Sequence, residues 1–338
     1  MAKRVKTIDV HSHVLPSEII AAIRQRPRDF QMRIEGSGEG EVFVRDDRHS
    51  TPVHREFHDA DAKVEAMDRK GIDISVISVT PVVFFYWLDA DTGLAAARIM
   101  NDGVAAMAAA RPDRLRGMAT LPMQDTDAAV AELERVVKAH GFRSVELGCR
   151  VRGELVSEPQ FRPVLRRAQE LGVFVFMHPY VAGELPPDLA CYYLGNLTGL
   201  PFDTALIAAH LMFGGALDEV TELVIVLAHG GGHLPYQIGR LEHGYHVRKE
   251  ARANSRRSPL ELLRRFYFDA LTHDADALGF LIEKAGADRV VIGTDAPFDM
   301  AETDPLAMIA RLAHLTRAER DRILGLNALE LLGESRPE

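Results

Sequence analysis

The sequence has little cysteine and lacks a long uninterrupted apolar run. Its two cysteines, Cys149 and Cys191, are too few for a disulfide framework and are typical of a protein in a reducing cytoplasm. The most apolar window, residues 72–88, is interrupted by Asp73 and Pro81 and is too short for a membrane-spanning helix. We therefore expect a cytoplasmic protein that does not bind membranes.

Blocks of charge of one sign are also missing. The formal net charge of −9 is spread along the chain, which argues against a nucleic-acid partner. The basic residues 1–6 are not followed by an apolar segment with a cleavage site, because Asp9 and His11 interrupt it, so we expect no secretory leader. Apolar residues make up 47% of the chain, which is enough for a sizeable core.

The chain instead alternates short apolar runs with longer helical segments. The strand-like runs lie at residues 5–10, 74–79, 115–121, 144–147, 173–177, 223–228, 266–270 and 290–293. Short, continuously apolar runs are typical of parallel strands that are covered on both faces. The helical segments lie at residues 59–70, 91–110, 126–140, 160–171, 203–217, 275–285 and 316–332. This order predicts an α/β fold, a (β/α)₈ TIM-type barrel.

Two stretches do not fit the alternation. Residues from about 16 to 58 are charged and contain glycine, and we expect them to form a small insertion after the first strand, with a hairpin near residues 41–45. Residues from about 180 to 200 predict a lid-like loop, since long loops in compact domains are usually functional. We therefore expect one barrel domain over residues 1–338.

Polar residues follow four of the predicted strands, where a barrel carries its catalytic residues. His11 and His13 end the first run, and side chains two apart on a strand point the same way, a natural start to a metal site. His178, His229 and Asp295 follow the fifth, sixth and eighth runs. Each alone is more often a hydrogen-bonded or turn residue, but together they indicate one shared site.

The chain resembles the amidohydrolase superfamily, and within it the aminocarboxymuconate semialdehyde decarboxylase-like branch. The order of strand-end residues, His-x-His, His, His and Asp, is the first part of this resemblance. The matching segments also extend over nearly the whole chain: residues 8–16, 67–71, 85–87, 120–124, 228–232, 239–240 and 293–298.

The resemblance implies that His11, His13, His178 and Asp295 bind one divalent metal ion, most often Zn²⁺ with Mn²⁺ as the alternative, and that no organic cofactor is needed. His229 is then a general acid/base, with Asp295 the second candidate for that role. Such a donor set leaves a position for water, whose pKa the cation lowers to about 7. An unligated histidine, with an ordinary pKa near ~6.5, suits proton transfer. A role for His229 as a fifth ligand stays open.

The same resemblance implies that Arg240 binds a substrate carboxylate, because a guanidinium makes bidentate contacts. The alternative is a helix-surface arginine paired with Glu242 or solvent. Trp87 could wall an apolar substrate pocket or simply pack in the core. Glu146 could bridge to a second metal, as in other branches, or form a hydrogen bond inside the barrel.

The segments expected to contact substrate depart from the branch pattern. Thr51 or a neighbour stands where muconate decarboxylases carry a second arginine, and Arg45, Arg48 and Arg55 are out of register with it. Residues 193–196 replace a tryptophan-containing loop. We therefore predict non-oxidative decarboxylation of a small aromatic or unsaturated, muconate-like carboxylic acid by a homodimer. Hydrolysis or hydration at the same site, and ligand binding without turnover, are the alternatives.

Overall fold

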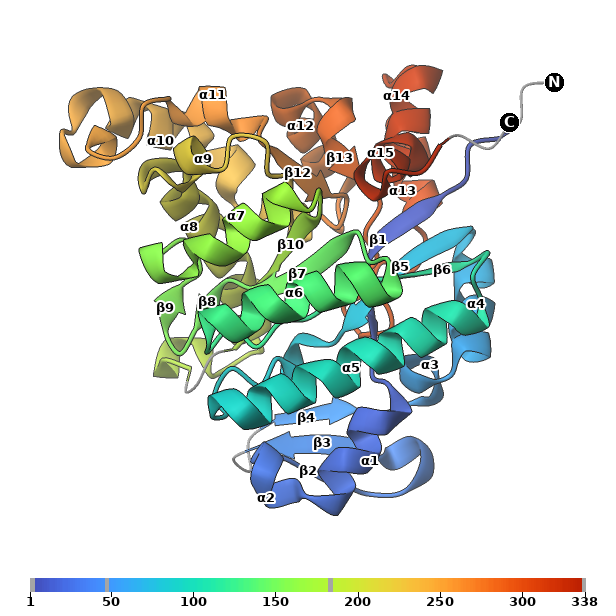
Figure 1. Cartoon of the computed structure of the whole chain (residues 1–338). Helices are drawn as coiled ribbons and strands as arrows, with labels where there is room; N and C mark the ends of the chain where they lie inside the picture. The colour runs from blue at the N-terminus through green and yellow to red at the C-terminus, as the bar shows by residue number, and fades with distance from the viewer. Residues whose placement is uncertain (1–3, 46–48, 182–184, 336–338) are drawn as a thin grey trace.

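The computed structural model describes residues 4–45, 49–181 and 185–335. Parallel strands form the centre of the molecule and helices cover their outer side (Figure 1). The strands form a three-stranded sheet in the order β1-β5-β6 and a five-stranded sheet in the order β13-β12-β11-β10-β7.

Backbone hydrogen bonds join these two sheets at both edges. Val10 N–H donates to Ile292 O at 2.9 Å, which links β1 to the segment after β13. Glu146 N–H donates to Ala119 O at 2.8 Å, which links β7 to the segment after β6. No edge strand of the eight described in these two sheets is left open, as barrel closure requires. The predicted TIM-type barrel is confirmed.

The structure gives the following bounds for the barrel elements. The strands are β1 (Ile8–Val14), β5 (Ile74–Val79), β6 (Leu115–Gly117), β7 (Ser144–Gly148), β10 (Phe174–His178), β11 (Ile225–Leu227), β12 (Phe266–Asp269) and β13 (Val290–Val291). The longer helices around them are α4 (Ala60–Lys70), α5 (Ala90–Ala110), α6 (Thr126–His140), α7 (Arg162–Glu170), α8 (Leu200–Phe213), α10 (Leu234–Val247) and α12 (Ala275–Ala285). In the part of the chain that the structure describes, no helix has the length and apolar character needed to cross a membrane.

Local sequence explains how these helices begin and end. In α4, for example, the Asp59 side chain accepts hydrogen bonds from the first-turn N–H groups of Asp61 and Ala62, as N-cap residues do. Gly71 ends the helix in the left-handed region, with φ of 69°, a conformation that glycine adopts without steric cost.

Several predicted boundaries were wrong. The first strand continues past Val10 to Val14, so His11 and His13 lie within β1, next to a register shift between Asp9 and Ser12. The predicted helix at residues 203–217 is interrupted, because α8 ends before Gly214 and Gly215 and α9 (Ala216–Glu219) follows. The last predicted helix consists of α14 (Arg317–Asp321), a π-helical turn and α15 (Asn327–Leu332).

The insertion after β1 contains more structure than the predicted hairpin. It comprises α1 (Ser17–Gln25), α2 (Pro27–Phe30), β2 (Arg33–Glu35), β3 (Val42–Arg45), β4 (His49–Pro52) and α3 (Arg55–His58). The three strands form an antiparallel sheet at one end of the barrel (Figure 1). Buried Phe30, Phe43 and Phe57 join the main hydrophobic core, which anchors the insertion. Arg48 lies outside the described residues.

The predicted lid-like segment is only partly irregular. It contains short turns at Pro187–Leu189 and Gly195–Gly199, and residues 182–184 lie outside the described part of the chain.

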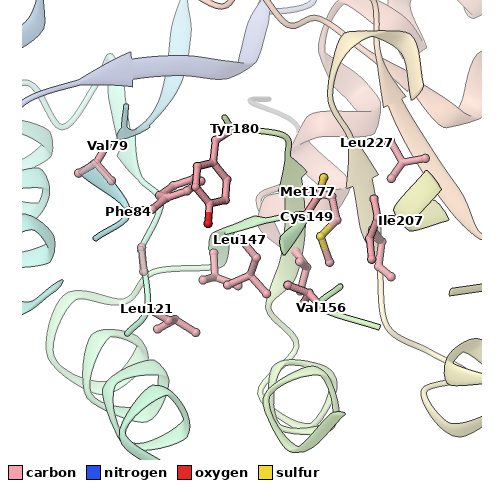
Figure 2. Close-up of a cluster of buried hydrophobic side chains, with 14 of the residues drawn as sticks. Val79, Phe84, Leu121, Leu147, Cys149, Val156, Met177, Tyr180, Ile207 and Leu227 are labelled. Atoms are coloured by element: carbon pink, nitrogen blue, oxygen red, sulfur yellow. The ribbon is translucent and has the colours of Figure 1, made fainter. Parts of the chain in front are cut away.

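The larger of two hydrophobic clusters lies between the barrel strands and the helices, and a second buried cluster, which includes Val76, Phe176 and Val226, comes largely from the barrel strands. Figure 2 shows Leu147 of β7, Met177 of β10, Leu227 of β11 and Ile207 of α8 in one buried cluster. All four side chains are fully buried, and each such burial contributes about 1.5–3 kcal/mol. Met177 directly precedes His178, so this packing also fixes a strand end that carries a candidate site residue.

Candidate metal centre

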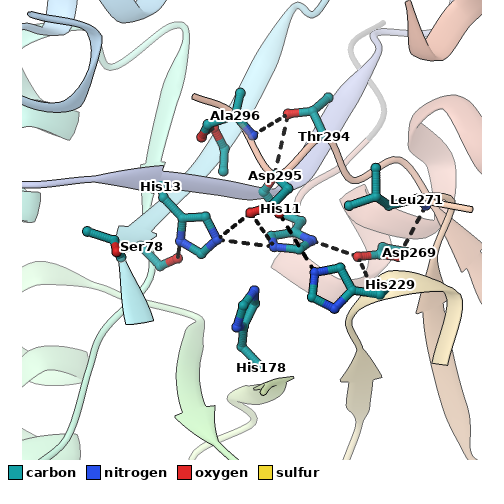
Figure 3. A network of polar contacts seen from close by, with 12 residues as sticks. His11, His13, Ser78, His178, His229, Asp269, Leu271, Thr294, Asp295 and Ala296 are labelled. Atoms are coloured by element: carbon teal, nitrogen blue, oxygen red, sulfur yellow. Dashed lines mark hydrogen bonds and ion pairs between the residues drawn. The ribbon is translucent and has the colours of Figure 1, made fainter. Parts of the chain in front are cut away.

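Four side chains converge at the C-terminal mouth of the barrel (Figure 3): His11 and His13 of β1, His178 at the end of β10, and Asp295 after β13. One ligand atom from each lies within 4.8 Å of the others. His11 Nε2 and His13 Nε2 are 3.1 Å apart. Asp295 Oδ1 lies 3.3 Å from His11 Nε2 and 3.1 Å from His13 Nε2. Tetrahedral metal–ligand bonds of about 2.0–2.1 Å place ligand atoms at similar separations, about 3.3 Å.

Each of the three imidazoles donates a hydrogen bond from Nδ1, and this bond fixes the orientation of the ring. His11 Nδ1–H donates to Asp269 Oδ2 at 2.7 Å, and His178 Nδ1–H donates to Pro179 O at 2.6 Å. His13 Nδ1–H donates to Val79 O at 3.3 Å. Because each acceptor is an oxygen, Nδ1 carries the proton and the Nε2 lone pair is directed at the cluster, as metal-ligating histidines require.

Two buried atoms of the cluster have no hydrogen-bond partner, His178 Nε2 and Asp295 Oδ1. Buried polar atoms are nearly always paired, and a cation between them would satisfy both. Three imidazole nitrogens and one carboxylate oxygen suit Zn²⁺ and similar first-row ions. The donor set therefore fits one divalent metal ion.

The charges of the cluster agree with this interpretation. Burial lowers the pKa of His13 to about 4 and lowers that of His178 well below its usual value, so both rings are neutral. Burial opposes ionisation of Asp295, but attraction to His11 and polar contacts with the histidine rings outweigh it and hold its pKa well below the usual range. For His11, burial is outweighed by Asp295 and Asp269, which raise its pKa to about 10. A metal ion at His11 Nε2 competes with this proton.

His229 lies beside the cluster and outside it. Its Nε2 is 3.7 Å from Asp295 Oδ2, and its buried Nδ1 has no hydrogen-bond partner. The residue follows β11 in the left-handed region, with φ of 55°, which is uncommon for a residue other than glycine and recurs at functional sites. This placement suits a group that transfers protons next to a metal.

A cavity of about 590 Å³ opens next to His229 and Asp295, a size typical of small-molecule sites. Its remaining polar lining comes from Asn196, Thr272 and His273. Most of its wall is apolar and comes from Leu197, Leu200, Pro201, Pro235, Tyr236, Leu271, Phe280, Leu281 and Met300. The size and composition suit a small molecule with few polar groups.

The structure does not bring the two predicted substrate contacts to this cavity. Arg240 is exposed on α10 and is not among the residues that line it. Trp87 is partly buried; its Nε1–H donates to Phe30 O at 3.4 Å, and the Arg45 guanidinium lies 4.1 Å from its ring centre. Trp87 therefore packs against the insertion, and substrate contacts by Arg240 and Trp87 stay predictions.

Glu146 occupies the barrel interior below the cluster. Its Oε1 is 3.9 Å from His13 Nδ1, and it is not one of the four clustered residues. Burial raises its pKa to about 8, so the side chain is largely protonated at neutral pH. The position is interior, but both carboxylate oxygens are buried without a hydrogen-bond partner, so the structure does not show the predicted interior hydrogen bond.

Two residues that support the cluster were missed in the sequence. Asp269 lies inside the seventh apolar run (266–270) and is the last residue of β12, so the strand-end signal that selected the other residues could have found it. Lys63 is fully buried on α4 and donates to His13 O and Ala296 O at 3.0 Å each. No sequence signal marks Lys63, because lysine in a charged helix usually faces solvent.

Comparison with known proteins independently supports the family resemblance that the sequence motifs predict. The amidohydrolase family model matches residues 8–333. A 2-amino-3-carboxymuconate-6-semialdehyde decarboxylase from Dictyostelium discoideum is 32% identical over 331 residues, which cover 96% of this chain and 91% of the relative. A gamma-resorcylate decarboxylase from Rhizobium sp. (strain MTP-10005) is 30% identical, with coverages of 86% and 91%.

A solved structure of a decarboxylase also resembles this chain over nearly its whole length. The crystal structure of a dihydroxybenzoic acid decarboxylase from Polaromonas sp. JS666, with bound manganese and the inhibitor 2-nitroresorcinol, has a TM-score of 0.79 and 25% identity over 97% of both chains. These matches confirm the resemblance predicted from the sequence motifs. The chain belongs to the amidohydrolase family, in the branch that resembles the aminocarboxymuconate semialdehyde decarboxylases.

Proposed function

We propose that this chain is a metal-dependent, non-oxidative decarboxylase of a small aromatic or unsaturated carboxylic acid. The observation that carries the proposal is the buried His11, His13, His178 and Asp295 cluster, next to His229 and a largely apolar cavity. Two relatives that match most of this chain are a 2-amino-3-carboxymuconate-6-semialdehyde decarboxylase and a gamma-resorcylate decarboxylase, which favours this reaction among those that such a site supports.

The proposed reaction divides the work between two groups of residues. His11, His13, His178 and Asp295 hold the divalent ion, which when bound supplies positive charge that stabilises negative charge developing on the substrate. The carbon–carbon bond to the carboxylate breaks, CO₂ leaves, and the electron pair stays on the substrate carbon. His229 then donates a proton to that carbon, forming the C–H bond of the product.

The surroundings of His229 support this role. The carboxylate of Asp295 lies 3.7 Å from His229 Nε2, which places the His229 ring directly beside the cluster. The apolar wall of the cavity excludes water, which favours the change from a charged carboxylate to neutral CO₂. To donate the proton itself, Asp295 would first have to be protonated, but the cluster holds its pKa well below the usual range. His229 is therefore the better donor.

The metal ion, the domain organisation, the location and the assembly are each proposed from a single observation. We infer Zn²⁺ as the ion because the donor set contains three imidazoles, with Mn²⁺ as the alternative. One barrel domain over the whole chain agrees with the shared core of insertion and barrel. A homodimer is supported by exposed aromatic side chains close to the cavity, since Tyr236 is 76% and Phe202 51% exposed, and such patches often mark interfaces. A cytoplasmic location is supported by the presence of only two cysteines.

The test is CO₂ release from a panel of hydroxybenzoates, carboxymuconate semialdehyde and related acids. Protein stripped of metal with a chelator should release none, and the same protein reloaded with Zn²⁺ or Mn²⁺ should release one CO₂ per substrate consumed. Turnover by the stripped protein, or the absence of CO₂ from every acid with metal-loaded protein, would contradict the proposal.

A further inference from the structure

One buried carboxylate contacts both the cluster and the proposed proton donor. Asp269, the last residue of β12, is fully buried. Its Oδ2 accepts a hydrogen bond from His11 Nδ1–H at 2.7 Å and another from the His229 backbone N–H at 2.9 Å (Figure 3). A single oxygen atom therefore connects a candidate metal ligand on β1 with the residue after β11.

The second oxygen of Asp269 completes the same connection. Its Oδ1 accepts from Gly230 N–H at 2.7 Å and from Leu271 N–H at 3.2 Å. A carboxylate offers about four acceptor sites, so the four donors use its capacity fully. Each donor comes from a backbone or ring position whose direction this anion can fix.

The backbone next to His229 needs such an anchor. His229, Gly230 and Gly231 have φ values of 55°, 60° and 75°, a left-handed run that brings adjacent N–H groups towards one point. Consecutive N–H groups in this arrangement form a concave site for an anion. Here the anion is the Asp269 carboxylate, so it determines the direction in which the His229 imidazole projects.

We propose that Asp269 is a positioning residue that couples the geometry of the metal ligand His11 to the placement of the proton donor His229. Removing the carboxylate should disturb both at once, because the same oxygen serves both. The turnover part of this inference rests on the function proposed above, whereas the metal-binding part does not.

The variant Asp269→Asn tests the coupling, because it keeps the shape of the side chain but replaces one acceptor oxygen by an NH₂ group. Glu132→Gln is the control for loss of a buried carboxylate. Glu132 is also fully buried, but it pairs with Asn101, Arg98 and Arg135 and makes no contact with the site.

The first measurement needs no substrate. Metal affinity is obtained by competition with a chelator, and the ligand geometry from the visible absorption spectrum of the Co²⁺-loaded protein. Asp269→Asn should weaken metal binding by about 10–100-fold, the usual effect of losing the partner of a metal-bound histidine, and should change the Co²⁺ spectrum. Glu132→Gln should leave both unchanged. Wild-type affinity and spectrum in Asp269→Asn would overturn the inference.

The second measurement is a double-mutant cycle on kcat at saturating metal. Asp269→Asn should lower kcat at least tenfold in the wild-type background and have little further effect in the His229→Ala background. Equal fold losses in both backgrounds would contradict the coupling to His229. If wild-type protein releases no CO₂, the proposed function fails while the metal measurement still decides the His11 part. If Asp269→Asn does not fold, Asp269→Ser takes its place, and failure of both to fold would make the residue structural and refute the proposal.

Discussion

Replacing His178 and His229 one at a time separates metal binding from proton transfer. His178 Nε2 is buried without a partner and lies within 4.8 Å of the other three ligand atoms. Its replacement by alanine removes one of four donors. His229 lies outside that set, with its Nε2 3.7 Å from Asp295 Oδ2, and its replacement leaves all four donors in place.

The two variants should therefore differ in metal content much more than in activity. In His178→Ala the metal affinity should fall by more than the roughly 10–100-fold that loss of an outer partner costs, and activity should be lost with the metal. In His229→Ala the metal content should stay near one ion per chain. Its rate should fall by about 10²–10⁴-fold, the usual contribution of general acid–base catalysis.

Metal per chain, measured by mass spectrometry after dialysis, and kcat decide between these outcomes. His243→Ala, at an exposed position of α10, is the control and should match the wild-type protein in both. If His229→Ala loses its metal as completely as His178→Ala, His229 is a ligand. Proton transfer would then need another group, and Asp295 would be the first candidate.

Three further predictions follow from the surroundings of the site. Burial raises the pKa of Glu146 to about 8 from an ordinary value of 4.5. The folded state therefore binds this proton more tightly than the unfolded state does. As a result, the metal-free protein should lose stability as pH rises from about 4.5 to 8. Glu146→Gln should remove this pH dependence, on the order of 3–5 kcal/mol at about 1.4 kcal/mol per pKa unit, in urea unfolding; an unchanged slope would contradict the assignment. Lys63→Met should cost about 1–3 kcal/mol and weaken metal binding, because it removes one hydrogen-bond donor from His13 O and one from Ala296 O; unaltered metal affinity would make Lys63 purely structural. Arg240→Ala should raise KM several-fold at unchanged metal content if Arg240 binds the substrate carboxylate, and an unchanged KM would leave it as a surface residue.

The sequence predicted the barrel and the converging residues because both depend on local patterns. Continuously apolar runs mark buried parallel strands, and the polar residues at their ends, such as His178 and Asp295, meet wherever those strands close into a barrel. The extent of β1 past Val10 was missed, since alternating polar residues there look like a loop although all are buried.

Interactions between distant parts of the chain could not be predicted in the same way. His11 and Asp269 are 258 residues apart in sequence, and Lys63 contacts the carbonyl groups of His13 and Ala296 only because α4 packs below that strand end. The insertion folds as a sheet whose short strands have no apolar periodicity. Arg240 matches a motif, but a motif does not determine whether its helix faces the cavity.

The central claim, that a carbon–carbon bond breaks and the carbon is then protonated, is tested most directly by solvent isotopes. The metal-loaded enzyme is incubated with a substrate acid in D₂O that contains H₂¹⁸O, and the organic product is analysed by mass spectrometry. Decarboxylation predicts a product that has lost CO₂, gained one deuterium on the carbon that carried the carboxylate, and contains no ¹⁸O. A product that keeps its carboxylate and contains ¹⁸O would show hydrolysis or hydration instead, and would contradict the claim.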